Sequence, residues 1–78
     1  MTDRESKICS AAREAVSAHA QSLKDVAIFV NKYITENRLG NPMTESGVGA
    51  VIAKFGRATL KQFTRDGAPW IESVANSN

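Results

Sequence analysis

The sequence predicts an all-α protein, a small bundle of three to four helices that forms one domain over residues 1–78. Apolar residues recur at three- and four-residue spacing along most of the chain, helix-breaking residues are few, and no stretch alternates apolar and polar residues for long enough to predict a strand. A chain of 78 residues buries only about 60 to 65 per cent of the surface that it exposes when unfolded. Its core is therefore thin, and we expect self-association as a homodimer to add stability.

The first helix is expected at about 5–20, where alanine and charged residues dominate. One side of it is apolar but small, which suits close packing against a neighbouring helix. The residues on that side are Ile8, Ala12, Ala15, Val16 and His19.

The second helix is expected at about 22–38. Ser22 has the character of an N-cap, and Asp25 supplies an acidic first turn. An apolar stripe follows at helical spacing, and the segment 37–42 (NRLGNP) then ends the helix with glycine and proline. The sequence leaves open whether the first two helices are separate or form one kinked rod.

The third helix is expected at about 46–65 as a single amphipathic rod. At about 100° per residue, its apolar residues fall on one side and its basic residues on the other. No acidic residue occurs between Glu45 and Asp66. The outer side is therefore predicted to be a purely cationic stripe made by Lys54, Arg57, Lys61 and Arg65.

A short fourth helix is expected at about 69–75, after a stop at residues 66–69 (DGAP). Pro69 suits the first position of a helix, where its missing N–H would have no partner in any case. Trp70 is expected to close the core.

The basic stripe has three interpretations. It could contact nucleic-acid phosphates, with Gln62 and Thr64 as neighbours that read bases, or it could meet an acidic protein surface, or it could be an ordinary solvated face. The first interpretation makes the chain a small DNA-binding protein and a candidate transcriptional regulator. The alternative is a small interaction module or inhibitor that docks on a larger protein. The predicted nucleic-acid-binding residues are Lys54, Arg57, Lys61, Gln62 and Arg65.

Residues 54–70 (KFGRATLKQFTRDGAPW) resemble the recognition-helix end of excisionase-like and terminase-small-subunit DNA-binding domains. The resemblance implies a helix-turn-helix in the C-terminal half, with Gly56 in its turn. The segment departs from that pattern because no polar turn follows the glycine, and because Ile52 stands where the motif has a small residue.

Enzymatic chemistry is not expected. Cys9 and His19 are the only cysteine and histidine, and on one helix they would lie about 15 Å apart and point about 80° apart, too far for a nucleophile and its base. The same count excludes a disulfide and a Cys/His zinc site within one chain, so no metal or cofactor is predicted. The Gly47–Gly49 pair lacks the strand and the lysine of a phosphate-binding loop.

The expected location is the cytoplasm. One unpaired thiol fits a reducing compartment, and the N-terminal residues do not form the pattern of a secretory signal. The longest apolar run, Val26 to Val30, is five residues, far below the roughly 18 needed to cross a bilayer, so no membrane partner is predicted.

Overall fold

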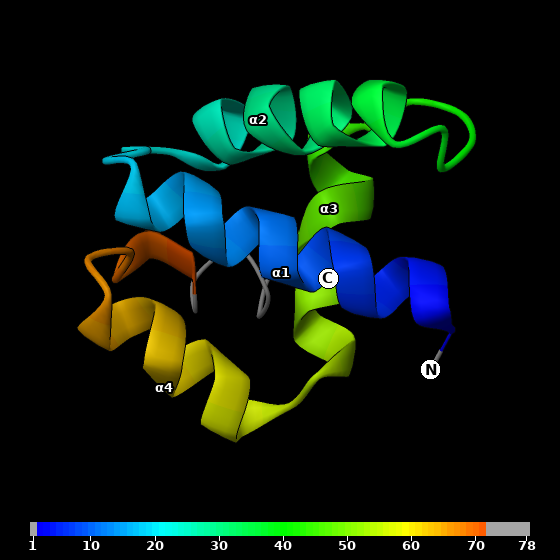
Figure 1. The fold of residues 1–78 in the computed structure, drawn as a ribbon. Helices are drawn as coiled ribbons and strands as arrows, with labels where there is room; N and C mark the ends of the chain where they lie inside the picture. The colour runs from blue at the N-terminus through cyan, green and yellow to red at the C-terminus, as the bar shows by residue number, and fades with distance from the viewer. Residues whose placement is uncertain (1, 72–78) are drawn as a thin grey trace.

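The computed structural model describes residues 2–71, and within this range the prediction of an all-α bundle is confirmed. Four helices follow one another along the chain: α1 (Asp3–Ser17), α2 (Leu23–Glu36), α3 (Glu45–Lys54) and α4 (Arg57–Arg65). Helices α1 and α2 lie side by side and antiparallel, α3 crosses them, and α4 contacts α3 and is drawn below α1 in Figure 1.

Helix α1 begins two residues earlier than the sequence predicted, because Thr2 and Glu5 form a capping box. The Thr2 side chain accepts a hydrogen bond from the Glu5 N–H, and the Glu5 carboxylate accepts one from the Thr2 N–H. The helix also ends earlier, at Ser17, because His19 adopts a left-handed conformation with φ 72°. The first two helices are therefore separate.

Helix α2 starts where the sequence predicted. The Ser22 Oγ accepts from the Asp25 N–H at 3.3 Å, and the Asp25 carboxylate accepts from the Gln21 N–H at 3.1 Å. The helix ends at Glu36, and Arg38 follows in a left-handed conformation with φ 54°.

The expectation of one continuous helix at 46–65 is wrong. The chain breaks at Phe55 and Gly56 into α3 and α4, and Gly56 has φ 86° and ψ −178°, a conformation open almost only to glycine. The turn instead folds α4 back so that it contacts α3, and Phe63 is fully buried.

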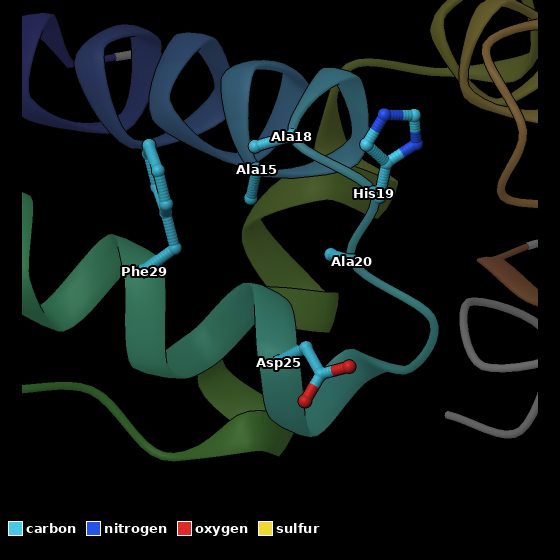
Figure 2. A pocket seen from close by; sticks show the side chains of 6 residues that line it. All are labelled: Ala15, Ala18, His19, Ala20, Asp25 and Phe29. Carbon is cyan, nitrogen blue, oxygen red and sulfur yellow. The ribbon is translucent and has the colours of Figure 1, made fainter.

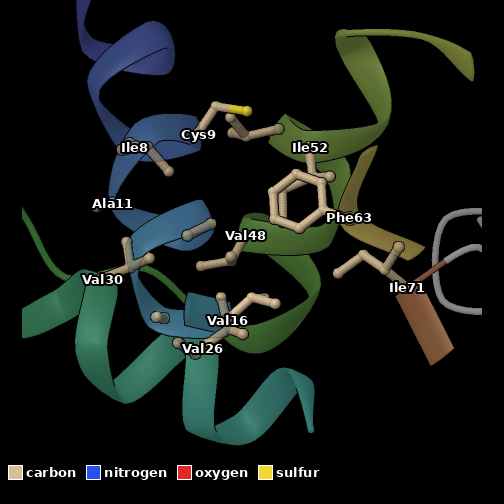
Figure 3. Packing of buried hydrophobic residues seen from close by; sticks show 14 of the residues in the cluster. Ile8, Cys9, Ala11, Val16, Val26, Val30, Val48, Ile52, Phe63 and Ile71 are labelled. Atoms are coloured by element: carbon tan, nitrogen blue, oxygen red, sulfur yellow. The ribbon is translucent and has the colours of Figure 1, made fainter. Parts of the chain in front are cut away.

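The core is a single cluster built mainly from α1, α2 and α3 (Figure 3). Alanines on α1 allow close approach of the neighbouring helices, as the sequence predicted, while α4 contributes only Phe63 to the buried set. After α4, Ala68 and Ile71 are buried, and Trp70 is half-buried at the edge of the core. Of the helix predicted at 69–75, Trp70 and Ile71 are helical, Pro69 lies in the preceding turn, and residues 72–75 lie outside the described residues.

Two side chains fix the long connection between α2 and α3. Arg4 donates to the backbone carbonyls of Leu39 at 2.7 Å and Asn41 at 3.1 Å. Asn31 pairs with the backbone of Met43 in both directions, donating to its carbonyl at 2.9 Å and accepting from its N–H at 2.7 Å. These contacts hold the start of α3 against the first two helices.

Candidate nucleic-acid interface

The predicted basic stripe is divided between two helices. Lys54 is the last residue of α3, whereas Arg57, Lys61 and Arg65 all belong to α4. We call these three α4 residues the cationic face. The turn at Gly56 separates Lys54 from the cationic face. The prediction that all four cations form one continuous row on a single helix is therefore wrong.

Lys54 is held by an acidic partner. Its Nζ lies 2.7 Å from Oε2 of Glu5, and the Glu5 side chain is only 15% exposed. The hydrogen bond from Lys54, together with that from the Thr2 N–H, lowers the pKa of Glu5 from 4.5 to about 2. The pair neutralises Lys54 at neutral pH, so Lys54 adds little to a positive surface.

The cationic face is formed by consecutive turns of one helix. Arg57, Lys61 and Arg65 are spaced by four residues and fall within an arc of about 80° at 100° per residue. All three are exposed, and none takes part in an ion pair found among residues 2–71. Phe63, on the opposite side of α4, is buried. The burial of Phe63 therefore directs the three cations toward solvent.

The first turn of α4 adds to this positive character. It holds no acidic residue, and Gly56 offers no side chain to cap the N-terminal N–H groups. Since the N-terminus of a helix carries a partial positive charge, the potential there has the same sign as that of Arg57.

Gln62 and Thr64 make local bonds. The Gln62 Nε2 donates to Oδ1 of Asp66 at 3.1 Å, and Gln62 is half-buried. The Thr64 hydroxyl donates to the Leu60 carbonyl at 3.2 Å. Asp66 also lies 4.0 Å from Arg13, which joins this end of α4 to α1. Gln62 thus stands at the α1 side of the cationic face and is engaged within the protein.

The junction of α3 and α4 has the connectivity of a helix-turn-helix. Its turn is Phe55 and Gly56, however, and is shorter than the three or four residues usual in that motif. This is consistent with the sequence, in which no polar turn follows the glycine.

Cys9 and His19, the two side chains considered for catalysis, lie in different environments and do not form a nucleophile and base pair. Cys9 is buried in the core, and burial raises the pKa of its thiol, which disfavours the nucleophilic thiolate. His19 is exposed beyond the end of α1. Among residues 2–71, no three His, Cys, Asp or Glu side chains are grouped closely enough to hold a metal ion.

The hollows on the surface are shallow. One of about 240 Å³ lies between α1 and α2, with Phe29 at one end and His19 and Asp25 toward the other (Figure 2). A second, of about 200 Å³, shares Phe29 and includes Tyr33. A third, of about 400 Å³, lies beside Trp70 and His19. We call the first two together the Phe29 groove.

Sequence reasoning did not single out the Phe29 groove. Beside it on α2 is Ile28, which is 61% exposed. The sequence does indicate that Ile28 is exposed, because its position in the helical period lies off the apolar stripe formed by Val26 and Val30, which faces the core.

Comparison with known proteins found no matching protein family, no similar curated protein and no similar solved structure. None of the helices in the described part of the chain has the length and apolar character needed to cross a membrane.

Proposed function

We propose that this chain is a small, non-enzymatic, cytoplasmic protein that binds nucleic acid, in the first place DNA, through the cationic face of α4, and that it serves as a regulator. The observation that carries the proposal is the arrangement of Arg57, Lys61 and Arg65, three exposed cations on successive turns with no acidic partner among residues 2–71. Lysine and arginine in such rows neutralise phosphates and release counterions, which is the main source of sequence-independent affinity.

The proposal uses fewer residues than the sequence predicted. Lys54 is paired with Glu5, and Gln62 is bonded to Asp66, so neither is included in the contact set. A set of three residues on one rigid helix still gives a defined surface, because α4 is anchored by Phe63.

The test is a mobility-shift assay with a non-specific DNA duplex at low salt. Arg57→Glu combined with Lys61→Glu should abolish binding, since each change both removes a cation from the contact surface and introduces repulsion with the phosphates. Circular dichroism checks that the variant keeps its helices. A matched control is Lys24→Glu with Lys32→Glu, which makes the same charge change on α2. Full DNA affinity in the α4 double variant would remove the proposal.

A second candidate function is docking on a larger protein, favoured by the Phe29 groove and the exposed Ile28. A pull-down with nuclease-treated lysate, comparing the wild type with Ile28→Ser, tests it. A partner that survives nuclease and is lost with Ile28→Ser supports docking, whereas one that is equally captured by Ile28→Ser does not involve this surface.

Self-association as a homodimer is part of the proposal, because a 78-residue core is small. Sedimentation equilibrium at tens of micromolar tests it, and a monomer at that concentration would contradict it.

A further inference from the structure

The cationic face offers no aromatic side chain on which unpaired bases could stack, because Phe63 is the only aromatic residue of α4 and it is buried. The chain has three phenylalanines, one tyrosine and one tryptophan. Phe63 is buried, and the other four are half-buried against the core. Proteins that hold single-stranded nucleic acid combine a basic groove with exposed aromatic rings. Of those two elements, α4 has only the positive charge, which favours a duplex as the ligand.

The dimensions of α4 fit the major groove of B-form DNA. Its nine residues span about 13.5 Å at 1.5 Å per residue, and a helix with its side chains is about 10 to 12 Å wide. The B-DNA major groove is about 12 Å wide and admits a helix, whereas the major groove of duplex RNA is deep and too narrow for side chains to read. Phe63 is the only fully buried residue of α4, so the outward half of the helix is open to such a groove.

The order of the three cations gives each a different place in that groove. Lys61 is the middle residue of α4 and the middle of the cationic arc. Arg57 and Arg65 lie about 6 Å to either side along the axis and about 40° to either side around it. When the middle of the arc points at the groove floor, the two arginines therefore point toward opposite walls, where the phosphates are.

We propose that α4 enters the major groove of duplex DNA with Lys61 directed at the base edges and with Arg57 and Arg65 on the phosphates of the two walls. This inference rests on the function proposed above and specifies its ligand. The chemistry is suitable, because a lysine ammonium donates to the N7 and O6 acceptors that guanine presents in the major groove. Arg57 and Arg65 then set position and affinity, while Lys61 distinguishes G·C pairs.

The first experiment measures fluorescence anisotropy with three probes of one length and one G·C-rich sequence: duplex DNA, single-stranded DNA and duplex RNA. The expected result is tightest binding to duplex DNA. The second experiment replaces guanine by 7-deazaguanine in the DNA duplex, which removes the N7 acceptor and keeps base pairing. Wild-type affinity should fall about fivefold, the equivalent of one good hydrogen bond.

The variants separate the two roles. Lys61→Ala should bind the guanine and 7-deazaguanine duplexes equally, because the residue that senses N7 is gone. Arg57→Ala and Arg65→Ala should bind both duplexes more weakly and keep the fivefold difference. Lys24→Ala, a lysine exposed on α2, is the matched control and should behave as the wild type.

The outcomes distinguish this inference from the proposed function. If single-stranded DNA or duplex RNA binds as tightly as duplex DNA, or if 7-deazaguanine leaves wild-type affinity unchanged, the major-groove placement is overturned while binding through the cationic face stands. If no probe binds at all, the proposed function itself fails. If Arg57→Ala abolishes the response to 7-deazaguanine as completely as Lys61→Ala does, the separate role of Lys61 is wrong.

Discussion

Lys54 Nζ lies 2.7 Å from Glu5 Oε2, an ion pair that joins the last residue of α3 to the first turn of α1. The same Glu5 carboxylate closes the capping box with Thr2. One carboxylate thus stabilises the N-terminus of α1 and at the same time holds the turn that leads into α4.

This pair predicts a specific response to acid. The pKa of Glu5 is lowered from 4.5 to about 2, so the stability that the carboxylate contributes is complete above pH 4.5 and is lost as the pH falls from 4.5 toward 2. In Lys54→Met the main cause of the shift is absent, and the pKa of Glu5 should rise toward its ordinary value. Carboxyl chemical shifts followed by NMR across this range measure it.

The matched control for that titration is Lys61→Met, which removes the same charge from a residue with no ion pair among those described. In Lys61→Met the pKa of Glu5 should be the same as in the wild type. An equal shift in both variants would mean that net charge, and not the contact with Lys54, sets the pKa of Glu5.

Gly56 is expected to be intolerant of substitution. Its φ of 86° and ψ of −178° are strained for any L-residue, and a Cβ built there meets nothing within 4 Å, so the cost is purely one of backbone conformation. Gly56→Ala should lower the free energy of unfolding by about 1 to 3 kcal/mol. Urea denaturation followed by circular dichroism measures the change.

Gly47→Ala is the control for Gly56, because Gly47 lies in helical backbone within α3. Alanine is favoured there by up to about 1 kcal/mol, less what the close contact at 3.3 Å with the Thr44 hydroxyl costs. If Gly56→Ala lowered the free energy of unfolding no more than Gly47→Ala does, the left-handed conformation of Gly56 between α3 and α4 would be contradicted.

Arg38 offers the opposite prediction, a stabilising change. It follows α2 in a left-handed conformation with φ 54°, and the next N–H, that of Leu39, donates to the Ile34 carbonyl at 3.0 Å. This is the Schellman motif, in which glycine is the usual residue at the left-handed position. Arg38→Gly should raise stability by about 0.5 to 1 kcal/mol because it removes the steric cost. A melting temperature a few degrees above that of the wild type would show this gain in stability. Arg38→Val should instead lower the melting temperature.

The bidentate contact of Asn31 with Met43 predicts a large loss on truncation. Asn31→Leu leaves the N–H and the carbonyl of half-buried Met43 without their partners, which should cost about 1 to 3 kcal/mol. Hydrogen exchange at the Met43 amide should accelerate in the same variant. Asn41→Ala, an exposed asparagine in the same connection, should leave the stability within about 0.5 kcal/mol of the wild type. Equal losses in the two variants would contradict a special role for Asn31.

Features fixed by neighbouring residues could be predicted from the sequence. The Ser22 cap depends on residues three positions apart and was predicted correctly. The apolar side of α1 followed from local spacing in the same way, except for His19, which was predicted on that side but is exposed beyond the end of the helix. The pairing of Gln62 with Asp66, four residues on, was also visible in principle, since such pairs are neighbours on one face of a helix.

Features fixed by distant residues could not be predicted. The apolar period of residues 48–65 continues across Gly56, so it does not show the break. Whether glycine stays helical there depends on how Phe63 packs against the core, which is a tertiary effect. Lys54 is neutralised by Glu5 from 49 positions away, and only the fold brings the two together.

The division of the basic stripe makes a final prediction about salt. With Lys61 on the base edges, α4 neutralises two phosphates, through Arg57 and Arg65, and the slope of log affinity against log salt should be about −1.8 per chain; a third phosphate on Lys54 would make it about −2.7. Lys54→Met should keep the slope near −1.8, because Lys54 is already paired with Glu5. Arg57→Ala should reduce the magnitude to about 0.9, because it removes one of two phosphate contacts. Anisotropy titrations of duplex DNA between 50 and about 200 mM salt measure both slopes. A wild-type slope near −2.7 that falls to about −1.8 in Lys54→Met would show that Lys54 leaves Glu5 when DNA binds, and that the contact surface extends across the turn onto α3.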